Sequence, residues 1–563
     1  MKRVVSLFAL IVALSGAAFA QPVVAPGGIV NAASYIPAGL PNYGIAQGSL
    51  FIVMGEGLGP PSIQVAQSVP WPTELAGTRV QVSVGPATVN AYLYYSSDRQ
   101  VAAVLPSNTP VGEGTLTVTY NGAASDPAPI RVVKSAFGIF SINQGGFGPG
   151  IVQNWYSDAD LRLNTVFESA RPGQAVIVWG TGLGPIGGND ADVPPVGNLD
   201  VQVEVFIGDR VVEPFYAGRT GMGVPSVDQV QFFVPEGIAG CRVPLAVRVN
   251  GVLSNYTTIS VAPEGGVCSD PADFSAEELR MIQESGRVRF GAVMLQLFSV
   301  HLRGAPEPFD GTFENASAQF HSVEFRDALG ALGLRGGRLT APGSCLVYTY
   351  ADQGDPTFAP DETARAQPLD AGPALTLTGP QGTAQLDREG PGFYQKEPLG
   401  GGLPGGEILP PFLVPGAYTL SNGDGGTDVG PFQAAITLPP MIEWTNREAL
   451  SEIDRSRDLT ITWQGGDDAT QLVTIVGFSL AAETDNSASF LCTARPGAGR
   501  FVVPAAVLSS LPATREPTDE DPFPAILAVG VHPLRAVGSF TAPGLDFGNF
   551  AYVMWITRDV LFR

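Results

Sequence analysis

The segment Gln-Val-Ala-Ala-Val-Leu-Pro at residues 100–106 returns as Gln-Val-Gln-Phe-Phe-Val-Pro at residues 229–235. A second segment, Asn-Gly-Ala-Ala-Ser at 121–125, returns as Asn-Gly-Val-Leu-Ser at 250–254, again 129 residues later. An offset that is kept over the length of a module indicates tandem domains. The repeated pieces are strand and hairpin patterns, because apolar runs lead to Pro and Asn-Gly favours a tight turn. The first half of the chain therefore contains two copies of one β-domain.

A third matched pair supports the repeat. Residues 49–60 correspond to residues 174–185 at an offset of 125, so the second copy contains a net insertion of four residues. In both copies an apolar run ends in three alternating glycines, where a strand can bulge or leave its sheet. A nucleotide-binding loop would need a helix directly after the glycines, and proline follows them in both copies. We therefore interpret these turns as strand ends.

The repeat resembles a known family. Ile-Val-Asn-Ala-Ala-Ser-Tyr at 29–35, the Gly-Leu-Gly-Pro turns, the Gln…Pro strands and the Asn-Gly-x-x-Ser hairpins look like the Solibacter-type carboxy-terminal domain family of exported bacterial proteins. Each copy is also similar to the immunoglobulin-like IPT/TIG fold. The resemblance covers about residues 27–262. It implies sandwich domains in an exported setting, and it brings no catalytic residues because the family has no established activity. Such domains tend to end a chain, whereas here they come first.

The first twenty residues have the pattern of a secretory signal. Lys2 and Arg3 precede an apolar run, and Ala-Phe-Ala at 18–20 is a cleavage site, so residues 1–20 are predicted to be removed. Nothing later in the sequence is long and apolar enough for a membrane-spanning helix. We expect no transmembrane segment in the mature chain and a secreted, periplasmic or cell-surface location.

The composition limits the classes of partner that the chain can bind. The formal net charge of −22 repels nucleic acid, which we exclude as a partner, and it also repels anionic lipid. Charged residues are 15% and hydrophobic residues 44% of the chain, which is typical of folded protein. The 69 glycines and 49 prolines favour many short strands joined by tight turns.

The predicted fold class is all-β, with tandem immunoglobulin-like sandwiches followed by a short helix and two further β modules. The sandwiches are placed at 21–134 and 135–262. A linker at 263–287 contains a helix with a Ser275–Glu278 capping box, an apolar face of Leu279, Met281 and Ile282, and an end at Gly286. The further modules are a β domain at 288–440 and a sandwich-like domain at 441–563.

Four cysteines in an exported chain suggest disulfides. The hairpin predicted at 250–251 brings Cys241 and Cys268 to the same end, and Cys345 and Cys492 then pair by elimination. That second bond would join the two last modules, so their boundary near 440 is weakly defined. Free buried thiols remain the alternative.

Few residues point to chemistry. The chain has three histidines and none of the motifs of metalloproteases, serine hydrolases or dithiol redox enzymes, so we name no catalytic residue. The Gly-rich segment 422–428 contains Asp424 and Asp428, whose oxygens suit calcium, but the segment lacks a complete EF-hand loop and the pattern favours a polar hairpin loop. Trp155 and Tyr156 lie in a polar stretch and are candidates for stacking on sugar rings.

These observations favour an exported, non-catalytic β protein that acts by display and contact in the cell envelope or outside the cell. Its partner would be an unknown protein or polysaccharide, and no cofactor is expected apart from the calcium candidate. Two alternatives stay open. One is an array of carbohydrate-binding modules, and the other is a hydrolase with its site in 288–563, because paired carboxylates can meet only in space.

Overall fold

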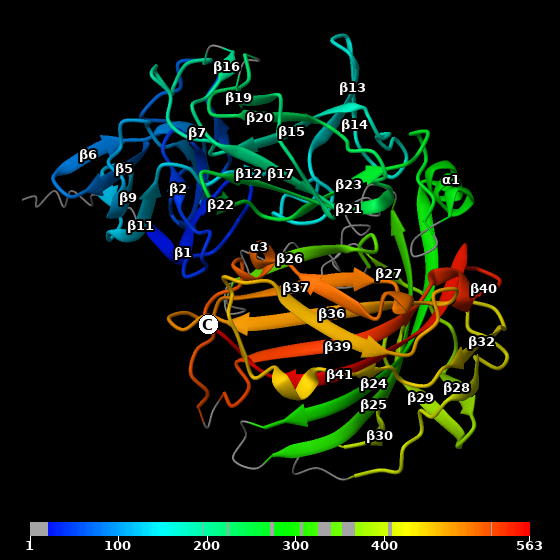
Figure 1. Cartoon of the computed structure of the whole chain (residues 1–563). Coiled ribbons are helices and arrows are strands. Elements are labelled where there is room, and N and C mark those ends of the chain that lie inside the picture. Colours follow the sequence, from blue (N-terminus) through cyan, green and yellow to red (C-terminus); the bar gives the residue numbers. More distant parts are fainter. Residues whose placement is uncertain are drawn as a thin grey trace, which may run out of the picture.

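The computed structural model describes residues 21–194, 196–221, 224–270, 275–303, 308–324, 339–351, 366–402, 408–518 and 521–563. The predicted signal peptide at 1–20 lies outside the described residues. Two sandwiches lie side by side, and a larger β domain packs beneath them (Figure 1). None of the described helices is long and apolar enough to span a membrane.

The first sandwich consists of two sheets that enclose one core. Strand β5 (Thr78–Val84) alternates buried residues with more exposed ones along its length, as expected of a strand with one face on a core. The first sheet has the order β1 (Val23–Asn31), β3 (Leu50–Glu56), β8 (Gln100–Val104), β7 (Tyr92–Ser96) and β4 (Gln64–Val65). The second has the order β2 (Ile45–Ala46), β11 (Ala128–Val133), β9 (Gly112–Tyr120), β5 (Thr78–Val84) and β6 (Ala87–Asn90), with β10 (Ala123–Ala124) on β9.

The second sandwich repeats this plan. One sheet has the order β14 (Asp160–Leu163), β13 (Val152–Ser157), β15 (Ala175–Thr181), β20 (Asp228–Phe233), β19 (Tyr216–Arg219) and β16 (Gly197–Asn198), with β12 (Gly138–Ile139) on β15. The other contains β18 (Arg210–Val212), β17 (Val203–Ile207), β21 (Gly240–Val249) and β22 (Val252–Leu253), with β23 (Thr257–Val261) on β21. The chain is therefore all-β, with tandem immunoglobulin-like sandwiches.

The sequence repeat maps onto equivalent structure. Strand β3 pairs with β8 in the first copy, and β15 pairs with β20 in the second. The Asn-Gly pairs at 121–122 and 250–251 turn the β9–β10 and β21–β22 hairpins, and all four residues have positive φ. A two-residue turn of this kind matches the twist of the strands that it joins.

A buried ion pair joins the two sandwiches. Arg219 and Asp228 are fully buried, and the guanidinium donates to the Asp228 carboxylate. The same guanidinium donates to the carbonyl oxygens of Gly48 in the first sandwich, at 2.8 Å, and of Gly184 in the second, at 2.9 Å. Asp228 also accepts from the backbone N–H groups of residues 182 and 183. The interface is thereby held by bonds that solvent cannot reach.

The linker helix α1 (Ala276–Ser285) has the predicted ends. Ser275 accepts from the backbone of Glu278, the Glu278 carboxylate accepts from the backbone of Ser275, and Gly286 ends the helix in a left-handed conformation. Leu279 and Ile282 are buried, whereas Met281 is exposed. The apolar face is thus narrower than the sequence predicted.

The remainder of the chain differs from the prediction of two modules. In the described residues a single sheet of 14 strands takes strands from both predicted modules. Strand β24 (Arg287–Leu302) pairs in parallel with β41 (Phe547–Asp559), from Phe290 opposite Phe547 to His301 opposite Arg558. The segments 288–440 and 441–563 are therefore joined across position 440. Local sequence patterns identify strands, but they do not show that strands some 250 residues apart pair with each other.

The main path of this sheet runs from β26 to β32. Its order is β26 (Ser344–Tyr350), β37 (Ser487–Ala494), β36 (Gln471–Leu480), β39 (Ala525–Pro533), β41, β24, β25 (Phe309–Glu324), β30 (Phe393–Gly401), β29 (Gly382–Gly390), β28 (Ala374–Gly379), β31 (Gly416–Ser421) and β32 (Gln433–Leu438). Short strands β27 (Gln367–Pro368) and β40 (Ser539–Phe540) add to β25 and β41.

Smaller elements pack on this sheet and share its main core. They are β33 (Glu443–Trp444), β35 (Leu459–Gln464), β38 (Arg500–Val503), β34 (Glu452–Ile453), β42 (Leu561–Phe562), α3 (Ala505–Leu508) and the short 3₁₀ turns η1 (Arg447–Ala449), η2 (Pro496–Ala498) and η3 (Arg535–Gly538). Ile461 of β35 and Val503 of β38 are buried in the same cluster as Ile475 of β36 and Val529 of β39.

The structure contains two disulfides. Cys241 in β21 bonds to Cys268 after the second sandwich. Cys345 in β26 and Cys492 in β37 bond across directly paired strands of the large sheet. The second bond therefore lies inside one sheet instead of joining separate modules.

Candidate functional site

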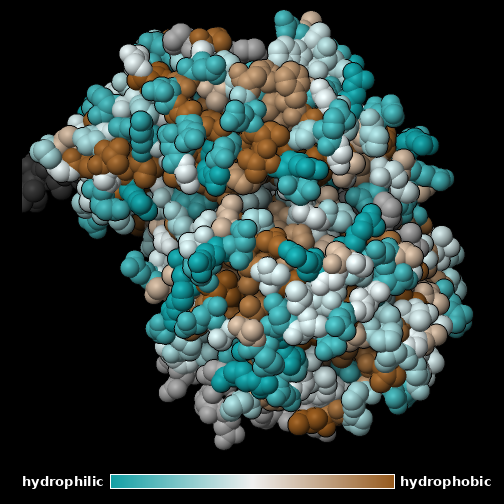
Figure 2. Space-filling view, in the orientation of Figure 1, coloured by the Kyte–Doolittle hydropathy of each residue, from teal (hydrophilic) through white to brown (hydrophobic). Residues whose placement is uncertain are grey.

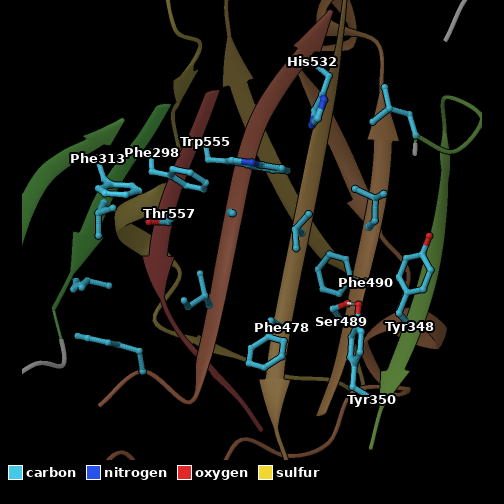
Figure 3. A pocket seen from close by; sticks show the side chains of 18 residues that line it. Phe298, Phe313, Tyr348, Tyr350, Phe478, Ser489, Phe490, His532, Trp555 and Thr557 are labelled. Atoms are coloured by element: carbon cyan, nitrogen blue, oxygen red, sulfur yellow. Dashed lines mark hydrogen bonds between the residues drawn. The ribbon is translucent and has the colours of Figure 1, made fainter. Parts of the chain in front are cut away.

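The main candidate site is an apolar pocket of about 660 Å³ on the large sheet. Neighbouring strands β26, β37, β36, β39, β41, β24 and β25 all contribute to it. Figure 3 shows their side chains pointing into a common space, with Phe298 and Phe313 toward one end and Tyr348 and Tyr350 toward the other. Alternation along the strands explains this arrangement, because every second residue of a strand faces the same side.

The walls of the pocket are aromatic and aliphatic. On β24, Phe298, Val300 and Leu302 face the pocket, while the residues between them face the opposite side. The remaining apolar lining comprises Phe313, Leu339, Tyr348, Tyr350, Val476, Phe478, Phe490, Leu491, Phe523, Ile526, Ala528 and Trp555. None of the described lining residues is an acid, a lysine or an arginine. The site therefore suits an uncharged, apolar occupant.

The polar groups of the pocket are few. Ser489, Thr557 and His532 line it beside the tyrosines. The Ser489 hydroxyl lies 3.4 Å from the Tyr350 hydroxyl, and the His532 ring packs edge-on against Trp555 with ring centres 5.8 Å apart. Burial lowers the pKa of His532 to about 4, so this imidazole is neutral at pH 7. A few uncharged donors and acceptors in an apolar cavity can orient a ligand without demanding that it be charged.

A second polar arrangement was not predicted from the sequence. The Ser299 hydroxyl lies 2.9 Å from Nε2 of His301, and Nδ1 of the same ring lies 2.6 Å from the Asp310 carboxylate. These are the atom pairs of a serine triad. His301 and Asp310 are directly opposite each other on β24 and β25, so cross-strand pairing places them together. The spacing of nine residues between them gives no recognisable motif.

The geometry of this Ser-His-Asp chain does not favour catalysis. Arg303 also binds Asp310, and hydrogen bonds from Arg303 and then His301 lower the pKa of that carboxyl to about 2. Ser299 lies in the middle of a strand that is paired on both sides, opposite Thr312 and Ile556. Backbone N–H groups engaged in such ladders cannot form an oxyanion hole. Strand alternation also turns Ser299 away from the apolar pocket.

The two aromatic residues predicted to contact sugars do not lie together. Trp155 packs beside Phe215, with ring centres 6.4 Å apart, on the outer face of the second sandwich. Tyr156 is exposed, but the Arg162 guanidinium covers its ring at 4.5 Å and its hydroxyl donates to Glu168 at 2.7 Å. Only Trp155 is therefore placed on an aromatic surface.

The loop predicted as a calcium candidate makes internal hydrogen bonds. Asp428 accepts from the backbone N–H of Asp370 at 2.9 Å, and Asp370 accepts from the hydroxyl of Thr427. Within the ranges that the structure describes, no three histidine, cysteine or acidic side chains converge as metal ligands. Calcium binding through Asp424 and Asp428 remains a prediction from the sequence.

Comparisons with known proteins leave the family open. No protein-family model and no curated protein matches the chain. The solved structures that are similar to the chain include domains 5–6 of the S-layer protein SbsC. These domains are 13% identical over 43% of this chain and 98% of that one, with a TM-score of 0.15. Another similar structure is the Bacteroides ovatus protein SGBP-B of the mixed-linkage glucan utilization locus, in complex with a mixed-linkage heptasaccharide. It is 9% identical over 77% of this chain and 82% of that one, with a TM-score of 0.12.

The FN1–FN3 domains of chicken CNTN1 are similar at 10% identity over 74% of this chain and 99% of that one, again with a TM-score of 0.12. At such low TM-scores these likenesses carry no argument about function. The resemblance to the Solibacter-type family likewise remains a prediction from the sequence.

Proposed function

We propose that this chain is an exported, non-catalytic binding protein that holds an uncharged apolar ligand in the pocket of its large sheet. The observation that carries the proposal is the pocket itself. Its volume of about 660 Å³ lies within the usual range of small-molecule sites. Seven adjoining strands supply its walls, so the cavity is built on the most extensively paired part of the molecule.

The chemistry of the lining supports a neutral ligand. A charged group would have to give up its hydration without meeting a counter-charge, which is strongly unfavourable in an apolar cavity. An aliphatic or aromatic molecule would instead replace water over aromatic walls and gain from hydrophobic burial. Ser489, the Tyr350 hydroxyl and neutral His532 would bind at most a hydroxyl, ester or amide of that molecule.

A non-catalytic role is supported by the polar groups. In the pocket, His532 packs on Trp555, and Ser489 is close to a tyrosine hydroxyl instead of a base. The Ser299–His301–Asp310 chain faces the other side of the sheet. We propose that the two sandwiches act as a rigid arm that displays the binding domain.

An exported setting is supported by two disulfides, since such bonds persist in oxidising compartments. We place the protein in the cell envelope, on the surface or outside the cell. There, a protein or polysaccharide would be the partner of the arm.

Titration of the mature chain with N-phenyl-1-naphthylamine, a neutral apolar fluorophore, tests the proposal. We expect saturable binding with enhanced fluorescence. Val476→Trp fills the pocket and should weaken binding at least about tenfold, whereas Val211→Trp, the same change at an exposed position of the second sandwich, should not. Equal effects of the two substitutions, or no saturable binding by the unaltered protein, would contradict the proposal.

A further inference from the structure

The outer face of one sheet of the second sandwich has an unusual composition. In β13, β15 and β20 every second residue is buried in the sandwich core, for example Asn154, Val178 and Phe232. The residues between them face outward. This outward set is extended by Tyr216, the first residue of β19, and by Phe215 just before it. The set is here called the aromatic–amide face: Gln153, Trp155, Ile177, Trp179, Phe215, Tyr216, Gln229, Gln231 and Phe233.

Large aromatic side chains are exposed on this face. Phe233 and Phe215 are 58% and 43% exposed, and their ring centres lie 4.9 Å apart. Trp155 continues the row, with its ring centre 6.4 Å from that of Phe215. Figure 2 shows hydrophobic side chains gathered on the surface over β15 and β20. An exposed aromatic cluster on a rigid sheet is costly unless something binds to it.

Uncharged amides lie beside the aromatic rings. Gln153 accepts from the indole N–H of Trp179 at 2.9 Å, and Gln231 donates to Gln229 at 2.8 Å. The first bond crosses from β15 to β13 and the second lies within β20, and each fixes the orientation of an amide. Gln153 and Gln231 are both opposite Ile177 of β15, so the two amides flank this strand. Each amide has both donor and acceptor groups, so the Gln153 NH₂ and the Gln231 oxygen can bind further partners.

This combination of groups selects one kind of occupant. The apolar face of a sugar ring packs on aromatic rings, and its hydroxyls need neutral groups that both donate and accept hydrogen bonds. The aromatic–amide face has no charged member, and the protein carries a net charge of −22, which disfavours an acidic polymer. A protein partner or a second copy would bury apolar surface without using the ordered glutamines.

We propose that the aromatic–amide face binds a neutral polysaccharide, with Trp155, Phe215 and Phe233 stacking on sugar rings and Gln153 and Gln231 binding hydroxyls. The face belongs to the second sandwich and shares no residue with the apolar pocket. The proposal therefore does not depend on ligand binding in that pocket.

Affinity electrophoresis of the mature chain in gels with hydroxyethylcellulose, xylan or amylose tests this proposal, and polygalacturonate serves as an acidic polymer. We expect retardation by at least one neutral polymer and none by polygalacturonate. Trp155→Ala and Phe233→Ala should each weaken retardation at least about tenfold, in the manner of aromatic residues at the centre of a binding site. Trp155→Tyr should keep most of it.

Tyr156→Ala is the matched control, because Tyr156 is adjacent in sequence but lies beneath Arg162, away from the aromatic–amide face. It should leave retardation unchanged, and thermal melting should show that all variants are folded. The proposal is overturned if no neutral polymer retards the protein or if Tyr156→Ala weakens retardation as much as Trp155→Ala. It is also overturned if sedimentation shows a dimer that Trp155→Ala dissociates, since the face would then bind a second copy.

Discussion

Replacing Arg219 by methionine should open the contact between the two sandwiches. The substitution removes the counter-charge of Asp228 and the donors to the carbonyl oxygens of Gly48 and Gly184, all of them buried. Breaking a buried ion pair by removing one partner costs about 3–5 kcal/mol, because the other charge stays buried without compensation. Since about 1.4 kcal/mol corresponds to a factor of ten, local opening should become roughly a hundredfold to several thousandfold more frequent.

Hydrogen exchange followed by mass spectrometry measures this opening directly. The backbone N–H groups of residues 182 and 183 donate to Asp228, so peptides that contain them should exchange faster by that factor. Peptides from the large sheet should be unaffected. Arg162→Met is the control, because Arg162 is half exposed and an exposed ion pair such as that with Asp160 contributes little to stability.

Two further measurements separate charge from packing. Asp228→Asn combined with Arg219→Met removes both charges, keeps an amide oxygen as acceptor for the N–H groups of residues 182 and 183, and should restore most of the protection. Burial raises the pKa of Asp228, so in Arg219→Met the loss should grow as the pH rises above about 4 and shrink when the carboxyl is protonated. Exchange in Arg219→Met within threefold of the unaltered protein at pH 7 would refute this account of the interface.

Further predictions concern His532, the calcium candidate and Ser299. Because burial lowers the pKa of His532 to about 4, the unfolded chain takes up a proton first as the pH falls below about 6.5. Stability should therefore fall between pH 6.5 and 4, by up to about 3 kcal/mol. Naphthylamine affinity should fall only near and below pH 4, where His532 of the folded protein takes up a proton, and His532→Gln should flatten both curves. Calcium should not raise the melting temperature, since the Asp428 carboxylate already accepts from the backbone N–H of Asp370 and the Thr427 hydroxyl already donates to Asp370. Calorimetric heat lost in Asp424→Asn would contradict this. A fluorophosphonate probe should not label Ser299, and labelling abolished by Ser299→Ala would overturn the non-catalytic assignment.

The predictable parts of the fold have local causes. An Asn-Gly pair between apolar runs specifies a hairpin by itself, and both such pairs turn hairpins here. The Ser275–Glu278 capping box likewise involves only neighbouring residues. The candidate sites depend less on local pattern. Trp155 was singled out by its polar surroundings, but Phe215 and Phe233 join it only because β19 and β20 lie on the same sheet as β13. A usable signal for the pocket was the apolar run at 472–476, which places large residues on both faces of a strand.

Local pattern in the chain was enough to predict two repeated β-sandwiches, their turns, a capped helix and the Cys241–Cys268 disulfide, because each depends on residues close in sequence or on a repeat. Cys345 and Cys492 are 147 residues apart, and the sequence paired them only by elimination. The folded molecule alone decided that strands from 288–440 and from 441–563 share one sheet, that Arg219 joins the sandwiches, and where the pocket lies. The physical reason is that strand pairing places side chains from residues 298 to 557 around one cavity. Hydrogen-bonded ladders between distant strands leave no mark in the spacing of the residues that form them.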